Sequence, residues 1–386
     1  MKVPLQDLKA GYQSVRSEIL QSVTEVMDSQ QYILGPKVAE LEATVASYCG
    51  VGHGIGVSSG TDALLLALMA LDVGHGDEVI TTPFTFFATA GSIVRVGANP
   101  VFVDINPDTF NLNAGKIEAA ISPKTKAIMP VHLYGQIAEM ERIMNIAHRH
   151  KLHVIEDAAQ AIGARRNGNP AGSFGHAACF SFYPTKNLGG AGDGGMVVTN
   201  DQALAERLKQ LRNHGEESRY QHRTVGMNGR MDGIQAAVLL AKFKHLDDWN
   251  SRRIENAHYY TPRLKNIAGV VPPSELPNST HIYHQYVIRC RQRDRLRQFL
   301  TDRGIGSGIY YPLPLHLQAC FANLGYHAGD FPAAETATQE VLALPIYPEL
   351  TREQQDMVID AITDFHRTES KISPNCSHCN PRGSGA

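Results

Sequence analysis

The chain has little of several features that would narrow its class at once. Its 386 residues include six cysteines and one tryptophan, which is too little cysteine for a disulfide framework. No apolar run approaches the ~20 residues that a membrane-spanning helix needs. With 36 basic and 38 acidic residues, the net charge of -2 gives no electrostatic footprint for nucleic acid or for an anionic membrane.

The N-terminal segment also lacks the pattern of a signal peptide. Residues 1–30 carry several acids and no apolar block. Hydrophobic residues make up 43% of the chain, which is ordinary for a packed globule and too high for a disordered protein. We therefore expect a cytoplasmic globular protein, with no membrane and no nucleic acid among its partners.

One pair of cysteines is closely spaced. Cys376 and Cys379 stand in a C-terminal segment rich in Pro, Gly, Ser and Asn, with His378 between them. A structural zinc site needs four ligands, and this segment offers three candidates. We expect residues 373–386 to form a flexible tail, with a metal clip as the alternative, and we expect no metal site elsewhere.

Apolar runs typical of strands alternate with helix-compatible runs through the first two-thirds of the chain. The strand-like runs are Val79–Thr81, Pro100–Asp104, Ala127–Val131, Val154–Glu156, Ala178–Phe182 and Gly195–Thr199. Helical spacing occurs at Ala63–Leu71, Ala88–Val96, Ala114–Ala120, Met140–His150 and Ala203–Arg212. This alternation predicts an α/β fold with a mostly parallel sheet, flanked by helices on both faces.

The pattern changes after residue 200. Gly233–His245 and a longer charged stretch from Leu246 to about Lys265 favour helices, and prolines then interrupt the chain. The remainder predicts a small α+β unit. We therefore expect a large α/β domain over residues 1–250, which includes an N-terminal arm (1–35) that packs on the second unit. A small C-terminal α+β domain covers residues 251–372.

Four local features carry chemistry. Lys186 lies on a loop after an apolar strand, among small residues that let the backbone bend tightly. Asp157 ends a buried strand, where an acid is costly unless it pairs with a cation. The run Ser58–Asp62 precedes a helix whose free N–H groups and dipole favour an anion. Thr82–Thr89 brings aromatic rings to another strand-to-helix turn.

One cofactor uses all four features, namely pyridoxal 5'-phosphate. A lysine binds its aldehyde as an aldimine, a carboxylate keeps its ring nitrogen protonated, a helix N-terminus holds its phosphate and an aromatic side chain covers its ring. Other phosphate chemistries fit less well, because the chain has neither a G-x-x-x-x-G-K-[ST] loop nor a dinucleotide-binding G-x-G-x-x-G. The Gly-rich run Val51–Gly56 leads into a strand rather than a helix.

Motifs spread over nearly the whole chain resemble the DegT-type nucleotide-sugar aminotransferases, which are pyridoxal-phosphate enzymes of fold type I. The motifs are Gln31–Pro36, Ser59–Ala63, Asp77–Ile80, Val101–Asp104, Pro130–Gly135, Glu156–Gln160, Ser181–Gly195, Gly226–Met231 and Leu344–Pro348. The resemblance implies an aspartate-aminotransferase-like fold with a large and a small domain. It also implies a ping-pong transfer of an amino group from an amino acid, usually L-glutamate, to a nucleotide-linked keto sugar. Pyridoxamine 5'-phosphate is the intermediate form of the cofactor.

The resemblance assigns a role to each matching residue. Lys186 is the Schiff-base lysine and proton shuttle, and Asp157 pairs with the ring nitrogen of the cofactor. Gln160 hydrogen-bonds the ring hydroxyl, and Phe86 stacks on the ring. The phosphate lies among Gly60, Thr61, Asp62 and Ser181. Asn228 reaches the phosphate of the neighbouring subunit, so the resemblance implies a homodimer with shared active sites.

The sugar is less closely defined. Phe-Tyr-Pro before the lysine and Gly-Asp-Gly-Gly after it are similar to enzymes that aminate C3 of a UDP- or dTDP-linked 3-keto sugar. Members that act at C4 of a 4-keto-6-deoxy sugar more often have His at the position of Tyr183, so C4 amination is the alternative. Arg219–His222 resembles enzymes for a UDP-linked 3-keto-N-acetylhexuronic acid, although those tend to have His where this chain has Tyr310. Candidate sugar contacts are His132, Tyr183, Arg230, Tyr311 and His316.

Three other functions stay open. Related enzymes that dehydrate sugars replace the lysine with histidine, so Lys186 favours transfer over elimination. Transamination of an aminocyclitol precursor is a further alternative. A regulatory protein that has kept the fold is the third, and the complete set of Lys186, Asp157, Gln160 and Ser181 argues against it. We expect His281 and His284 to lie on a strand of the small domain, with structural roles.

Overall fold

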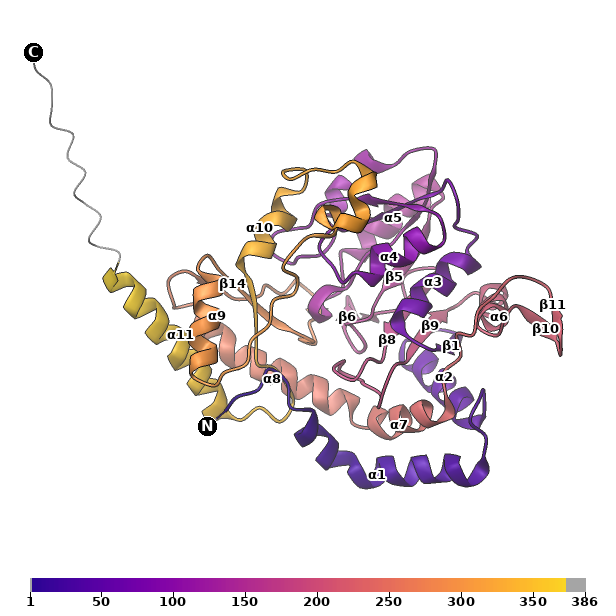
Figure 1. Ribbon diagram of the computed structural model, residues 1–386, viewed down its shortest axis with the longest axis horizontal. Helices are drawn as coiled ribbons and strands as arrows, with labels where there is room; N and C mark the ends of the chain where they lie inside the picture. Colours follow the sequence, from indigo (N-terminus) through magenta and orange to yellow (C-terminus); the bar gives the residue numbers. More distant parts are fainter. Residues whose placement is uncertain (1, 373–386) are drawn as a thin grey trace, which may run out of the picture.

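The computed structural model describes residues 2–372, and its centre is a seven-stranded sheet (Figure 1). The strands follow the order β1-β9-β8-β5-β4-β2-β3. β9 runs antiparallel to β1 and β8, and the pairs from β8 to β3 are parallel. The strands are β1 (His53–Val57), β2 (Glu78–Thr81), β3 (Asn99–Phe102), β4 (Thr125–Ile128), β5 (His153–Asp157), β8 (Ala177–Ser181) and β9 (Gly195–Thr199). The predicted α/β class with a mostly parallel sheet is confirmed.

Helices cover both faces of this sheet, because successive strand residues point in opposite directions. Val79, Ile155 and Cys179 pack with α3, α4 and α6 on one face, whereas Ile80 and Val154 pack with α2, α5 and α7 on the other. The helices are α2 (Pro36–Tyr48), α3 (Gly60–Ala70), α4 (Ala88–Arg95), α5 (Met140–His150), α6 (Gln202–Leu211) and α7 (Gly233–Phe243). Burial on both sides explains why the strands are continuous apolar runs in the sequence.

One predicted helix has a different structure. Ala114–Ala120 forms two short 3-10 turns, η1 (Ala114–Lys116) and η2 (Glu118–Ala120), so the expected α-helix is wrong. Gly115 disfavours a helix at this place. The side-chain oxygen of Asn113 accepts the N–H of Gly115 at 3.0 Å, which closes a tight local turn instead.

The N-terminal arm contacts both parts of the molecule. It contains a long helix, α1 (Leu8–Ser29), whose Val15 packs against Val238 of α7 below the large sheet (Figure 1). Before this helix, Val3 forms a parallel bridge with Ile305 of the second unit. The arm therefore contacts the second unit at its start and packs mainly on the first.

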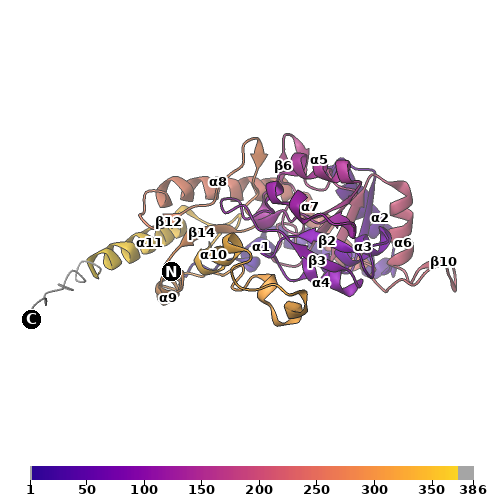
Figure 2. The same cartoon turned by 90° about the horizontal axis from the view of Figure 1, so that it is seen from above.

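The second unit is built on a three-stranded antiparallel sheet, in the order β12-β14-β15. Its elements are α8 (Leu246–Leu264), β12 (Val270–Val271), β14 (Tyr286–Cys290), α9 (Arg293–Asp302), η4 (Leu315–Leu317), η5 (Ala319–Leu324), α10 (Pro332–Glu340), β15 (Val341–Leu344) and α11 (Arg352–Ile372). In α8, Leu246 packs in the core of the large sheet and Tyr260 in that of the small one. The proposed boundary near residue 250 thus falls inside this helix, and Figure 2 shows the two units side by side.

Short elements complete the chain. They are β6 (Arg165–Arg166), β7 (Asn169–Pro170), β10 (Glu216–Ser218), β11 (Gln221–His222), β13 (Ser279–Thr280) and η3 (Leu133–Gly135). The β10–β11 hairpin projects from the body of the molecule near α6 (Figure 1).

The described residues show neither a membrane-spanning helix nor a cluster of metal ligands. Within residues 2–372, no helix is both long and apolar enough to cross a bilayer. In the same part of the chain, no three His, Cys, Asp or Glu side chains gather as a metal site would need. Cys376 and Cys379 lie outside the described residues.

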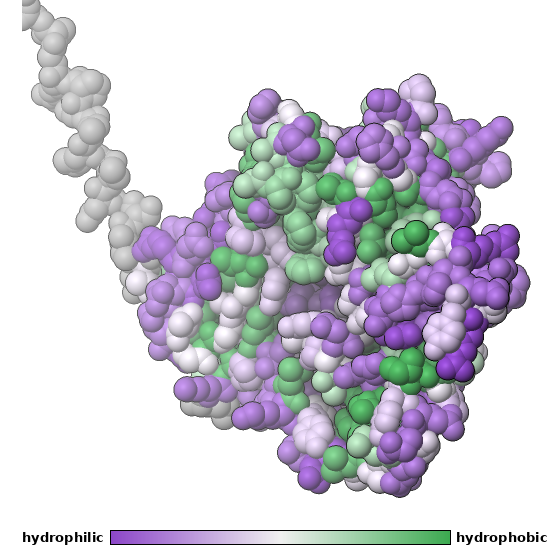
Figure 3. Space-filling view, turned by 45° about the vertical axis from the view of Figure 1, so that its right-hand side comes forward, coloured by the Kyte–Doolittle hydropathy of each residue, from purple (hydrophilic) through white to green (hydrophobic). Residues whose placement is uncertain are grey.

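The face seen in Figure 3 is mainly hydrophilic, with separate apolar patches around a hollow near its centre.

Candidate active site

The predicted lysine and acid meet in one cavity of about 630 Å³. Lys186 lies in the loop that follows β8, and Asp157 is the last residue of the neighbouring strand β5. Both side chains line the cavity, which also receives the N-terminus of α3 and residues 284–285 and 310–311 of the second unit. A site at the carboxyl ends of parallel strands is usual for an open α/β sheet.

The amine of Lys186 is held in a poorly solvated place. Loss of solvation lowers its pKa from 10.5 to about 8, and the negative charge of Asp157 opposes this shift. The uncharged, nucleophilic form of the amine is therefore a minority near neutral pH, but a far larger one than in an ordinary lysine.

Asp157 is buried and held by two donors. The hydroxyl of Thr89 donates to Oδ2 at 2.7 Å, and the N–H of Ala159 donates to Oδ1 at 3.2 Å. Thr85 lies 3.0 Å from Thr89, hydroxyl to hydroxyl. Because the Thr89 proton points to the carboxylate, Thr85 must be the donor in this second bond. Burial raises the pKa of Asp157, while the hydrogen bonds from Thr89 and Ala159 and the charge of Lys186 lower it.

An anion cradle lies at the start of α3. Gly60, Thr61 and Ser181 line the cavity there. A Cβ built on Gly60 would lie 2.6 Å from the Cβ of Ser181, so only glycine lets the helix approach β8 this closely. The first N–H groups of a helix are unpaired and attract anions.

Asp62 lies beside this cradle with its carboxylate turned away. Its Oδ2 accepts the hydroxyls of Ser58 (2.6 Å) and Ser59 (2.9 Å), and its N–H donates to Ser59 Oγ (3.0 Å). The structure therefore gives its side chain to the cap of α3 rather than to the cavity. A second negative charge facing a phosphate would also be repelled.

Gln160 and three aromatic residues also line the cavity. Gln160 accepts the N–H of Tyr134 at 2.7 Å and donates to the Tyr311 hydroxyl at 3.2 Å, so its amide orientation is fixed. The rings of Phe86 and Tyr311 lie 6.3 Å apart, centroid to centroid, and Tyr183 also lines the cavity. Phe86 is 57% exposed, so the face of its ring is available to stack on a flat ligand.

Besides Asp62, four other predicted site residues do not line this cavity. His132 is fully buried, with Nε2 2.8 Å from Glu156 and Nδ1 accepting the Ala138 N–H. Because Glu156 and Asp157 are neighbours in a strand, they point to opposite faces, and His132 follows Glu156. The expected substrate contact of His132 is therefore not what the structure shows.

The other three lie in different surroundings. His316 is 2% exposed, bonds to Glu335 at 3.1 Å and packs on an aromatic ring, so it stabilises its own loop. Arg230 donates to Asn213 at 2.8 Å. Asn228 is exposed and forms a backbone bridge with the same Asn213. Arg230 and Asn228 thus lie outside the cavity of their own chain.

Sequence reasoning missed several residues of the wall. These are Thr85, Tyr134, Asp193, His284, Gln285 and Tyr310. Thr85 and Thr89 lie in the aromatic run Thr82–Thr89, but Thr85 precedes α4 and only Thr89 belongs to it, so no helical periodicity marks the pair in the sequence. His284, Gln285 and Tyr310 belong to loops of the second unit that carry no motif, so only the fold brings them to the cavity of Lys186.

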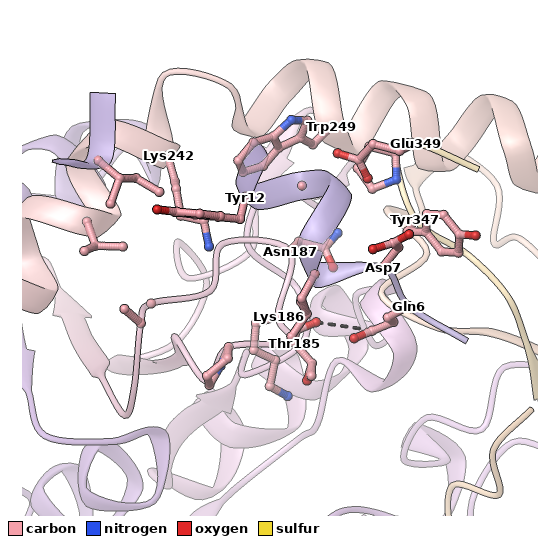
Figure 4. A pocket seen from close by; sticks show the side chains of 18 of the residues that line it. Gln6, Asp7, Tyr12, Thr185, Lys186, Asn187, Lys242, Trp249, Tyr347 and Glu349 are labelled. Carbon is pink, nitrogen blue, oxygen red and sulfur yellow. Dashed lines mark hydrogen bonds between the residues drawn. The ribbon is translucent and has the colours of Figure 1, made fainter. Parts of the chain in front are cut away.

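The lysine loop is braced from behind. The side-chain amide of Gln6 donates to the carbonyl of Thr185 at 3.3 Å (Figure 4). On this side a smaller cavity of about 230 Å³ lies beside Tyr12 and Trp249, and the Lys186 side chain turns away from it. The loop that carries Lys186 therefore separates the 230 Å³ cavity beside Tyr12 and Trp249 from the 630 Å³ cavity that contains Asp157.

The residues present fit pyridoxal 5'-phosphate. A reactive amine of lowered pKa, a buried carboxylate held by two donors, a glycine-dependent anion cradle and an exposed ring share one cavity. Gln160 adds a donor on the side of Tyr311.

Comparison with known proteins agrees with this geometry. Residues 13–363 match the DegT/DnrJ/EryC1/StrS aminotransferase family. The chain is 54% identical to a "pleiotropic regulatory protein" of Geobacillus stearothermophilus, over 95% of this chain and 99% of that one. It is 48% identical to a UDP-N-acetyl-3-dehydro-alpha-D-glucosamine 3-aminotransferase of Acidithiobacillus ferrooxidans, over 91% and 95%.

A solved structure is similar over almost the whole fold. DesV of S. venezuelae, in complex with a ketimine intermediate, superposes with a TM-score of 0.93 at 45% identity and covers 95% of this chain and 98% of its own. The chain therefore belongs to the DegT/DnrJ/EryC1/StrS aminotransferase family, and it is an aminotransferase that depends on pyridoxal 5'-phosphate.

Proposed function

We propose that this enzyme moves an amino group from L-glutamate to C3 of a UDP- or dTDP-linked 3-keto sugar, by a ping-pong mechanism. The observation that carries the proposal is the single cavity in which the amine of Lys186 faces the buried carboxylate of Asp157. The cytoplasmic location expected from the sequence stays a prediction.

Each residue has a distinct task in this proposal. When bound, the cofactor supplies an electron sink for the carbon that gains or loses nitrogen. Lys186 holds or releases a proton at its Nζ, which the lowered pKa of about 8 makes feasible near neutral pH. Asp157 presents an anion to the ring nitrogen, and Thr89 and Ala159 keep that anion in place. Gly60, Thr61 and Ser181 bind the phosphate.

The preference for C3 rests on two supports. The loop around Lys186 has Tyr183 before it and Gly-Asp-Gly-Gly after it, as in the resemblance to 3-aminating enzymes. The relative from A. ferrooxidans, 48% identical, is named for amination at position 3. Tyr183 and Tyr311 line the cavity and remain the proposed sugar contacts, while C4 amination is the alternative.

We also propose a homodimer with shared active sites, which the charge of the cavity supports. Among the described residues that line it, Lys186 is the one cation, whereas Asp157 and Asp193 are acids. A nucleotide diphosphate and the carboxylates of glutamate need further positive charge. The projecting β10–β11 segment has Arg219 on it and Val225 86% exposed after it, so it is suited to reach a partner together with Asn228.

The decisive experiment is an assay with a panel of sugars. The cofactor-loaded enzyme is incubated with 15N-glutamate and UDP- and dTDP-linked 3-keto and 4-keto sugars, and the products are analysed by mass spectrometry. We expect nitrogen gain on the 3-keto members, and none with Lys186→Ala. Nitrogen gain only on 4-keto sugars would move the reaction to C4, and loss of water without nitrogen gain would replace transfer with dehydration.

A further inference from the structure

Asp104 is a buried acid that lies outside the cavity of Lys186. It ends the motif Val101–Asp104, directly after β3, and is 3% exposed. Its Oδ1 accepts the N–H of Ala334 at 3.0 Å and that of Ile105 at 2.9 Å, and its Oδ2 accepts the N–H of Ala333 at 3.1 Å. A buried carboxylate is costly unless such donors replace its lost hydration.

Two of these donors belong to the first turn of α10, which has no side-chain cap of its own. Phe331 occupies the cap position and offers no side-chain acceptor. Pro332 has no N–H, and Glu335 donates its N–H to the carbonyl of Phe331 at 2.9 Å. The two N–H groups that Asp104 accepts are therefore those that the helix would leave unpaired. An acid of the large unit thus caps a helix of the second unit, at sequence separations of 229 and 230 residues.

The capped helix closes an excursion of the chain that carries part of the cavity wall. Gly308 and Ala343 of β15 exchange backbone hydrogen bonds at 3.1 and 2.7 Å, so residues 309–340 leave the small sheet and return to the same place. This 309–340 excursion begins with Tyr310 and Tyr311, which line the cavity, and ends with α10. Figures 1 and 2 show it in orange beside the large unit.

A series of contacts leads from α10 back to Tyr311. Glu335, in the first turn of the helix, bonds to Nε2 of His316 at 3.1 Å. The N–H of Leu315, the residue before His316, donates to the carbonyl of Pro83 in the large unit at 2.7 Å. The loop after Tyr311 is therefore held both by the large unit and by α10, whose own start is held by the acid of β3.

Tyr311 is the point at which the excursion reaches the site. Its hydroxyl accepts the amide of Gln160 at 3.2 Å, and its ring centroid lies 6.3 Å from that of Phe86. Both of these residues are expected to contact the cofactor ring, and Tyr311 is a proposed sugar contact. A displacement of the excursion would therefore change this wall and leave the cradle at Gly60 in place.

We propose that Asp104 is a positioning residue of the active site: by capping α10 from the large unit, it holds the 309–340 excursion in place and keeps Tyr311 at the cavity wall. Asp104 does not line the cavity, so it acts only through the excursion. The effect on the sugar rests on the proposed function, in which Tyr311 contacts the nucleotide-linked keto sugar.

The test combines hydrogen exchange, which needs no sugar, with kinetics of the cofactor-loaded, full-length enzyme. Asp104→Ala removes both acceptors from α10. We expect amide exchange in peptides that cover residues 309–318 and 332–340, measured by mass spectrometry, to become about fivefold faster or more. The KM for the keto sugar should rise about tenfold, because the wall is misplaced. The affinity for pyridoxal 5'-phosphate should change by less than about twofold, because the helix N-terminus that binds its phosphate is untouched.

Two variants separate positioning from a general loss of stability. Asp201→Ala is the matched control, because Asp201 caps α6 through two N–H groups at 2.8 and 3.1 Å and does not line the cavity. It should speed exchange in α6 and leave both residues 309–318 and the KM unchanged. Asp104→Asn keeps one acceptor oxygen at the cap, so its exchange and its KM should lie between those of the wild type and Asp104→Ala. It carries the same test if the alanine variant does not fold.

Three results would overturn the inference. The first is faster exchange confined to residues 332–340, which would make the cap a local feature of α10. The second is an equal increase at residues 309–318 in Asp201→Ala, and the third is an unchanged KM despite faster exchange at residues 309–318 in Asp104→Ala. If no nucleotide sugar is aminated but exchange at residues 309–318 still rises in Asp104→Ala alone, the proposed function fails and the positioning of the excursion by Asp104 stands.

Discussion

At the scale of single residues, the site depends on two ionisable groups that modify each other. Burial lowers the pKa of Lys186 to about 8 and raises that of Asp157, and the opposite charge of each partner counteracts the effect of burial. Removing one charge must therefore move the other pKa in a known direction.

The first prediction concerns the pH dependence of Lys186. In the cofactor-free protein, labelling of this amine by an acylating reagent should be half-maximal near pH 8 rather than near 10.5. Asp157→Asn removes the anion that favours the charged amine, so its midpoint should lie lower still. The modification is followed by peptide mass spectrometry, and a midpoint that rises in the variant would contradict the proposed pairing.

The second prediction concerns Thr89. The pKa of Asp157 in the folded state lies above its ordinary value of 3.8, so the folded state binds this proton more tightly than the unfolded state. The stability that this proton provides is present at low pH and is lost as pH rises through the folded-state pKa. Thr89→Val removes a donor and raises the pKa further. The free energy of unfolding should fall by about 1–3 kcal/mol at pH 7 and by less at pH 4.

Denaturant titration of the cofactor-free variant and wild type at both pH values gives this difference. Thr85→Val is the control, since Thr85 donates to Thr89 and not to the acid. A loss in Thr89→Val that is equal at the two pH values would indicate packing rather than charge.

At the scale of elements, the site depends on how closely α3 approaches β8. Ser59 caps the helix, and Gly60 lies against Ser181 with no room for a Cβ. The cradle therefore requires contact between a helix start and a strand end that are more than 100 residues apart in the chain.

Gly60→Ala should consequently push α3 away from Ser181. We expect the affinity for pyridoxal 5'-phosphate to fall at least tenfold, as measured by absorbance titration, because the N–H groups no longer converge on the phosphate. Gly74→Ala is the matched control, since the nearest atom to its Cβ would be 3.7 Å away. Unchanged affinity in Gly60→Ala would exclude the cradle.

At the scale of the whole molecule, each chain has its own cavity. It also has residues outside that cavity which we expect to contact the cofactor in the cavity of a partner chain. Lys186 lies inside, whereas Asn228 is exposed near the projecting hairpin. A pair of chains related by a two-fold axis would exchange these parts symmetrically.

Subunit mixing tests this exchange. Lys186→Ala and Asn228→Ala should each be nearly inactive alone. When they are unfolded, mixed equally and refolded, half of the dimers are hybrids with one complete site of two, so activity should recover to roughly a quarter of the wild-type value. A mixture no more active than its components would indicate that Asn228 serves its own chain or none.

The sequence by itself determined many elements of the large sheet and its helices, and the lysine and acid of the site. β9 and α5 have the predicted bounds Gly195–Thr199 and Met140–His150, because a buried strand and an amphipathic helix carry their pattern locally. Lys186 and Asp157 were recognisable for the same reason, since one follows an apolar strand, the other ends one, and both belong to motifs.

Only the tertiary structure decided which polar side chains face the cavity. Asp157 ends β5 and His132 follows β4, yet the alternation of side chains along β5 directs Glu156, and His132 with it, away from the site. His284 lies far along the chain in the other unit and enters the wall because Asn187 and Asn250 hold it there. Such placements depend on packing between distant segments, and a local pattern carries no information about it.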